Sequence, residues 1–269
     1  MRPMFRKPIT HPEFLHPDFR HIEFRPFEFR RSEFRQSPGR YFFFHCSRFV
    51  ALILLLAASD VACAQLSGSV SLVSNYVYRG VSLSNDQPEP QVSLAYDNDG
   101  GWFGGLFLSR VALPQSNSQL IGYAGYAQRW HSDMSWEAGV NVATYPQNNG
   151  QNYGEAFVGW STERLNARVY YSPNYLGQSL HSLYSEINAN TPLTADIHLI
   201  AHVGYLAVRA GDGDSHAGNH RDIRLGLGTS HGDWSFQIAV TSLTRTDWSD
   251  YYPRVSQTYG GVANIAYGF

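Results

Sequence analysis

The sequence predicts an all-β fold, a single antiparallel transmembrane β-barrel of about twelve strands. Three observations predict it. Segments of about ten residues alternate in polarity, as tilted membrane strands do. Short and long clusters of turn-forming residues alternate between these segments. Aromatic residues, 14% of the chain, gather at the segment ends. The alternative is a soluble β-sandwich, but sandwich strands rarely run for ten residues.

Residues 1–45 differ from the rest of the chain. Phe14, Phe19, Phe24, Phe29 and Phe34 recur every five residues, each after an acidic residue. A period of five matches neither a helix nor a strand, so no continuous apolar face can form. We expect a disordered, low-complexity leader, explained by a mis-called translation start, with a long basic export segment as the alternative.

Residues 46–64 have the organisation of a signal peptide. The apolar run Phe49–Ala58 follows basic residues and is too short to span a membrane as a helix. It ends near Ala62-Cys63-Ala64, a small-residue cleavage pattern that predicts a mature chain beginning at Gln65. Lipidation of Cys63 is the alternative, but Asp60 stands where a lipoprotein signal carries a leucine-like residue.

The predicted mature chain, residues 65–269, is acidic and free of cysteine. It holds ten Arg, no Lys and 16 Asp or Glu. This balance excludes the electrostatic footprint of a nucleic-acid-binding protein. The absence of cysteine means that no disulfide is needed after export.

The predicted strands follow one another along the mature chain. The clearest is Trp136–Tyr145, in which Trp136 and Val140 share one face while Glu137 and Asn141 share the other. Alternation, strong or weak, marks the other segments at 69–79, 91–97, 102–111, 120–129, 154–161, 166–172, 180–190, 196–205, 222–227, 234–241 and 259–269. The last segment ends at Phe269, which resembles the signal read by the outer-membrane assembly machinery.

The connections discriminate between folds better than the strands do. Short clusters lie at 98–101, 131–135, 162–165, 191–194 and 231–233. Mostly longer clusters lie at 81–90, 112–118, 146–151, 173–179, 207–220 and 244–257. Outer-membrane barrels place short turns and both termini in the periplasm and long loops outside. We therefore expect the cell outer membrane as the location, with both termini periplasmic.

Several segments resemble the TorF-type putative porin family. Residues 74–82, which read SNYVYRGVS, and 87–91, which read QPEPQ, resemble the family's opening. Later pieces at 101–105, 144–146, 152–155 and 170–175 fit as well. The resemblance covers essentially all of 65–269 and implies an outer-membrane barrel whose transport role is unproven. The 64-residue leader departs from the short signal peptides expected of the family.

Charged residues on the polar faces are the candidate pore-lining set. They are Arg79, Arg168, Arg224, Asp97, Glu137, Glu155, Glu186 and Asp196. We expect Arg79 and Arg224 near the outer mouth, above Asp97, Glu137 and Asp196 at the periplasmic end, so that they set which solutes pass. The alternative is a network of paired charges that fills the lumen and stabilises the wall, because twelve strands allow either.

The expected function is passive diffusion of small polar or charged solutes, without cofactor, metal or catalytic residues. The 212–220 loop carries acidic and His residues, but Ile223 stands where a calcium loop needs a carboxylate. His198 and His202 lie about 13 Å apart on a strand, too far to share one ion. A closed structural or adhesive barrel is the main alternative. An outer-membrane phospholipase is the enzyme alternative, although no G-x-S-x-G motif supports it.

Overall fold

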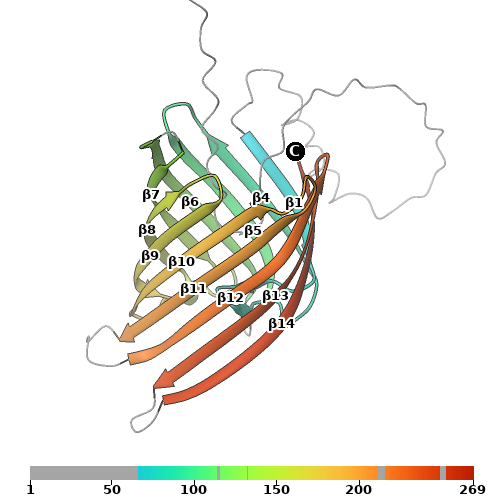
Figure 1. Cartoon of the computed structure of the whole chain (residues 1–269). Helices are drawn as coiled ribbons and strands as arrows, with labels where there is room; N and C mark the ends of the chain where they lie inside the picture. Colours follow the sequence, from blue (N-terminus) through green and yellow to red (C-terminus); the bar gives the residue numbers. More distant parts are fainter. Residues whose placement is uncertain (1–65, 114–115, 132, 211–215, 249–252) are drawn as a thin grey trace, which may run out of the picture.

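The computed structural model describes residues 66–113, 116–131, 133–210, 216–248 and 253–269. The predicted leader, the signal peptide and Gln65 lie outside these residues. The described chain forms a closed barrel of twelve antiparallel strands (Figure 1). No helix among the described residues has the length and apolar character needed to cross a membrane.

The barrel strands lie side by side in chain order, and β1 closes the ring against β14. Their bounds are β1 Leu66–Val73, β4 Glu89–Asp97, β5 Trp102–Leu113, β6 Ser116–Arg129, β7 Ser135–Thr144, β8 Tyr153–Ser161, β9 Leu165–Tyr175, β10 Leu180–Pro192, β11 His198–Ala210, β12 His216–His231, β13 Trp234–Trp248 and β14 Pro253–Gly268. A two-stranded hairpin, β2 Val77–Tyr78 and β3 Val81–Ser82, is separate from this sheet. A single turn of 3₁₀-helix spans Asn149–Gln151.

The seam of the barrel joins the two ends of the described chain. Ser69 pairs with Gly268 and Val73 with Asn264. Gly68 and Phe269 then exchange two backbone hydrogen bonds of 2.9 Å. The C-terminal residue therefore takes part in closure, so that neither strand is left as an open edge.

Two ends of the barrel can be distinguished from the topology. The terminal end holds Leu66, Phe269 and the turns between β4 and β5, β6 and β7, β8 and β9, β10 and β11, and β12 and β13. The distal end, toward the bottom of Figure 1, holds the other connections. The predicted short clusters all lie at the terminal end, but the predicted longer cluster at 112–118 is largely strand, because β5 extends to Leu113 and β6 begins at Ser116.

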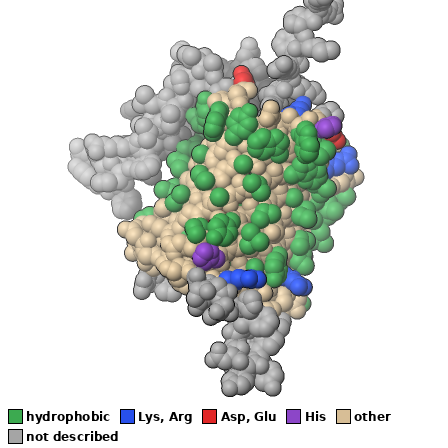
Figure 2. Space-filling view, turned by 90° about the vertical axis from the view of Figure 1, so that its left-hand side faces the viewer, with side chains coloured by type: hydrophobic (Ala, Val, Ile, Leu, Met, Phe, Trp, Pro, Cys, Tyr) green, Lys and Arg blue, Asp and Glu red, His purple; other side chains and the backbone are tan. Residues whose placement is uncertain are grey.

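The outer surface is apolar, as the alternating pattern predicts. Val140 and Ile238 are 55% and 64% exposed on outward faces, and Figure 2 shows hydrophobic side chains spread over the face formed by the left side of Figure 1. Aromatic rings pack against one another near the terminal end, with centroids 5.3 Å apart for Trp102 and Tyr126 and 5.1 Å apart for Trp234 and Tyr267. An apolar band with an aromatic girdle is the surface that lipid requires.

The strands on one side are longer than the sequence predicts. The expected loop at 207–220 is largely strand, because β11 extends to Ala210 and β12 begins at His216. The expected loop at 244–257 is also largely strand, because β13 extends to Trp248 and β14 begins at Pro253. Arg245 and Thr246 still pair in register with Ser256 and Val255. Cross-strand hydrogen bonds continue where the alternation of polarity ends, so polar composition alone did not mark the strand ends.

The prediction of a strand over 69–79 is wrong beyond Val73, where β1 ends. Residues 74–88, here called the inner hairpin, leave the wall, and Tyr76 is almost fully buried rather than facing lipid. Arg79 and Gly80 have φ of 48° and 77°, and Asn85 and Asp86 have φ of 53° and 58°. These left-handed conformations make two tight turns that a continuing strand does not contain.

Candidate constriction inside the barrel

The inner hairpin is braced by its own polar side chains. The side-chain amide of Asn75 donates to Asp86 at 2.6 Å, and its carbonyl oxygen accepts from the hydroxyls of Ser82 at 2.7 Å and Ser84 at 3.1 Å. The Ser84 hydroxyl also accepts from the backbone N–H of Tyr76 at 2.9 Å. These local bonds satisfy polar groups that the segment carries into the barrel.

Arg79 lies at the turn of the inner hairpin and binds the barrel wall. Its Nη1 and Nη2 donate to Oε1 and Oε2 of Glu155 on β8 at 2.8 and 2.7 Å. Asn141 on β7 also donates to this carboxylate, at 3.3 Å. Burial alone would lower the pKa of the Arg79 guanidinium, but the Glu155 carboxylate raises it well above its usual range. The two hydrogen bonds make the contact bidentate, the strong form of an Arg–carboxylate pair.

Aromatic rings enclose the Arg79 guanidinium. Its central carbon lies 4.3 Å from the ring centroid of Tyr184 on β10 and 5.1 Å from those of Tyr170 on β9 and Tyr78 on the hairpin. A cation held over the faces of several aromatic rings gains attraction from each ring, and more when it is shielded from water. The three rings and Glu155 fix the guanidinium in one position.

Other contacts extend the inner hairpin to further strands of the wall. The Tyr76 hydroxyl donates to Gln119 on β6 at 2.6 Å, and Gln119 donates to Tyr145 at 2.8 Å. A Cβ on Gly80 would lie 2.5 Å from the Cβ of Asp222 on β12 and 2.9 Å from Leu243 on β13. The hairpin therefore meets wall strands on both sides of the barrel and crosses its lumen.

A second ion pair lies on the inner wall. The Nε of Arg168 on β9 donates to Glu137 on β7, and both residues are 3% exposed. Arg168 also approaches the Tyr170 hydroxyl at 3.4 Å, which in turn donates to Glu186 on β10 at 3.2 Å. Four predicted residues, Arg79, Glu155, Arg168 and Glu137, thus form two buried pairs inside the barrel.

A third polar cluster centres on His202 of β11. Its Nε2 lies 2.7 Å from Asp222, and its Nδ1 lies 2.6 Å from the side-chain oxygen of Asn188. The Tyr184 hydroxyl donates to Asp222 at 3.3 Å and lies 3.2 Å from His202. His202 is considered in the sequence analysis but Asp222 and Tyr184 are not, although Asp222 lies two positions before Arg224 and so on the same face of its strand.

The remaining predicted residues lie in different parts of the barrel. Arg224 is half-buried on the inner face of β12, opposite Thr241 and His202 in register. Asp97 ends β4 at the terminal end. Asp196 is exposed in the turn between β10 and β11, so it does not face the lumen from a strand. Arg79, expected on the wall near the mouth, is carried by the inner hairpin instead.

The inner faces of the two halves of the barrel differ. Along β5–β10 they carry the buried rings of Phe103, Tyr123, Phe157, Tyr170 and Tyr184, which form one hydrophobic cluster with Ala127 and Leu206. In the middle of β12–β14 the inner positions are half-buried and mostly small or polar: Arg224, Gly226, Gln237, Ala239, Thr241, Val262 and Asn264; Asp222, Gly228, Leu243 and Ala266 on the same inner face are buried. The second half is therefore the more open to water.

Among the residues that the structure describes, no group of three or more His, Cys, Asp or Glu side chains is arranged to hold a metal ion.

The sequence pattern of a family described as "Bacterial protein of unknown function (Gcw_chp)" matches residues 57–260. No curated protein matches the chain. Solved structures similar to it include the KdgM porin, at 13% identity, a TM-score of 0.48 and coverage of 76% of this chain and 99% of that one. The NanC porin matches at 11% identity and a TM-score of 0.47, over 75% of this chain and 98% of that one. The outer membrane protein OprD of Pseudomonas aeruginosa matches at 11% identity and a TM-score of 0.38, over 77% and 65%.

Proposed function

We propose that this chain, which belongs to the Gcw_chp family of bacterial proteins, is an outer-membrane channel that passes small polar or charged solutes by diffusion. The inner hairpin is its constriction. The closed barrel supports this proposal, because a barrel with an apolar outside and a polar inside is a structure that lipid tolerates around an aqueous path.

The location is part of the same proposal. The apolar run Phe49–Ala58 and the Ala62-Cys63-Ala64 pattern support export with cleavage before Gln65. Phe269 at the end of the closing strand supports recognition by the barrel-assembly machinery. By analogy with outer-membrane barrels, the terminal end with its tight turns faces the periplasm. The TorF-type resemblance of residues 74–91 belongs to this proposal as well.

One observation carries the channel function. The inner hairpin is held against β8–β10 through Arg79 and reaches Asp222 on β12 at Gly80, while the inner positions in the middle of β12–β14 are half-buried and mostly small or polar. A folded loop that narrows a barrel without filling its whole section leaves a path beside the loop, past the half-buried positions of the wall. Polar side chains on that wall can replace part of a solute's hydration shell.

Conductance of the mature protein, residues 65–269, in a planar bilayer tests the proposal. We expect discrete channels in the parent and larger ones when residues 75–87 are replaced by a short Gly-Ser turn. A control variant shortened in the 146–151 connection should conduct as the parent does. The same conductance with and without the inner hairpin would show that the hairpin does not limit passage.

A closed structural barrel is the second candidate, favoured by the buried ion pairs and aromatic rings along β5–β10. It predicts a parent protein that inserts into bilayers without conducting. The phospholipase alternative requires a serine activated by a histidine. The described partners of His202 are Asn188, Asp222 and Tyr184, which does not support it. We therefore propose no enzymatic activity and no cofactor.

A further inference from the structure

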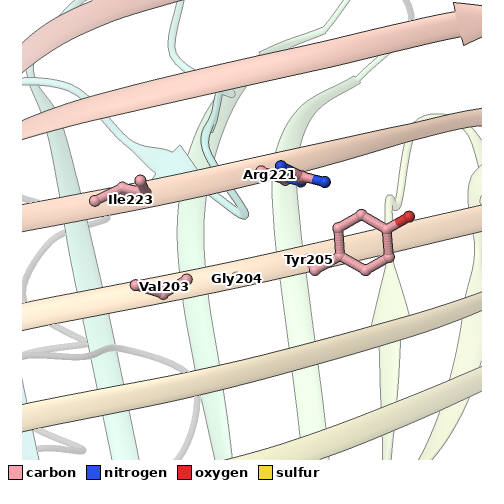
Figure 3. A pocket seen from close by; sticks show the side chains of 5 residues that line it. All are labelled: Val203, Gly204, Tyr205, Arg221 and Ile223. Carbon is pink, nitrogen blue, oxygen red and sulfur yellow. The ribbon is translucent and has the colours of Figure 1, made fainter.

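A groove of about 380 Å³ lies on the outer surface of the barrel, between β11 and β12. Val203, Gly204, Tyr205, Arg221 and Ile223 line it (Figure 3). Val203 and Ile223 are 55% and 51% exposed, so the groove opens away from the lumen. Its walls are apolar apart from the polar ends of Tyr205 and Arg221.

The strand register explains the shape of the groove. Val203 pairs with Ile223, and Tyr205 pairs with Arg221. These four outward side chains stand at the corners of a rectangle whose floor includes the backbone of Gly204. The Arg221 guanidinium carbon lies 5.8 Å from the centroid of the Tyr205 ring. This cation–π contact keeps the charge on the barrel surface, beside the groove.

Arg221 lies at the distal boundary of the apolar band. The outward positions Ile223, Leu225 and Leu227 follow it along β12, which ends at His231. Ten residues of a strand tilted as in outer-membrane barrels rise about 25 Å along the barrel axis, the height of such a band. Arg209, exposed farther along β11, lies on the distal side of Tyr205. The guanidinium of Arg221 is therefore at the depth of lipid headgroups, with the groove reaching into the acyl region.

We propose that this groove binds one membrane lipid with an anionic phosphate headgroup, its phosphate on Arg221 and the upper part of an acyl chain between Val203 and Ile223. The proposal rests on the barrel being in a membrane, as in the proposed function. A planar guanidinium matches two phosphate oxygens at once. Charge complementarity favours an anionic lipid over a zwitterionic one, and an apolar furrow favours an acyl chain over a free ion.

Native mass spectrometry of the mature protein in detergent tests the site. Phosphatidylglycerol and phosphatidylcholine with the same acyl chains are added in turn. We expect the parent to retain phosphatidylglycerol preferentially, and Arg221→Gln to weaken this binding about tenfold through loss of the charge-assisted contact. Arg110→Gln is the matched control, because Arg110 on β5 is exposed but lies 3.8 Å from Glu89, which offsets its charge.

A second arm tests the groove. Ile223→Ala keeps the charge and removes part of one wall, so it should weaken retention of the long-chain lipid. Glycerol 3-phosphate, which has no acyl chain, should not displace the lipid. Equal retention of both lipids by the parent, or no difference between Arg221→Gln and Arg110→Gln, overturns the lipid site. The conductance of the same preparations reports on the proposed function separately, because neither substitution alters the lumen.

Discussion

Arg79 and Glu155, 76 positions apart in sequence, form a bidentate ion pair inside the barrel, with hydrogen bonds of 2.8 and 2.7 Å. The pair ties the inner hairpin to β8. It is enclosed by the rings of Tyr78, Tyr170 and Tyr184. Its position decides how much of the lumen the hairpin occupies.

Removing one partner of this pair should destabilise the protein strongly. Arg79→Met leaves Glu155 charged and buried, and we expect a loss of about 3–5 kcal/mol in the free energy of unfolding. The double variant Arg79→Met, Glu155→Gln should lose less, because no buried charge remains. Reversible urea unfolding in detergent measures both. A double variant as unstable as the single one would mean that the pair acts through shape and not through charge.

Gly204 should tolerate no side chain. A Cβ at this inward position would overlap the Tyr184 hydroxyl and lie 2.5 Å from Oδ2 of Asp222. We expect Gly204→Ala to cost about 1–3 kcal/mol, because the cluster of His202, Asp222 and Tyr184 must move. Gly261→Ala on β14 is the control, since nothing lies within 4 Å of its added Cβ. Equal thermal stability of the two variants would contradict the packing described for the cluster.

The facing of the strands can be tested by placing arginine on each face. Val140 is exposed on the outer face, so Val140→Arg should cost about 2–4 kcal/mol if it lies near the membrane midplane. Gln237 is half-buried on the inner face of β13, and Gln237→Arg should be tolerated much better. Asn141, the inward neighbour of Val140, does not suit this test, because it is buried and donates a hydrogen bond to Glu155. Similar losses in lipid-based unfolding for both variants would reject the assigned faces.

Ion selectivity should depend on Arg224 more than on Arg79. Arg79 is buried against Glu155, whereas Arg224 is half-buried on the inner face of β12 and so keeps contact with water. Arg224→Gln should shift the reversal potential in a KCl gradient toward cation preference, most clearly at low salt where screening is weak. Arg110→Gln, on the outer surface, serves as the control. A reversal potential that responds equally to both changes would place the selectivity outside the lumen.

The sequence by itself determined the wall of this barrel. The number of strands, their order and their lipid-facing positions follow from a period of two, which is a local property of the chain. Val140 and Ile238 are exposed on the outer face, and β14 closes the barrel against β1, as the alternation predicts. Glu137, Glu155 and Arg168 are on the inner face for the same reason.

Only the tertiary structure decided what fills the lumen. Residues 74–88 are polar and rich in turn-forming residues, and such a composition suits a loop in water as well as a loop inside a polar barrel. Arg79 is retained inside because Glu155, Tyr170 and Tyr184, from three separate strands, converge on it. The distal ends of β12–β14 could not be predicted from the sequence pattern either, because backbone hydrogen bonding extends a strand past its last apolar residue. Contacts between residues far apart in sequence have no local signal, and here they hold the inner hairpin inside the barrel.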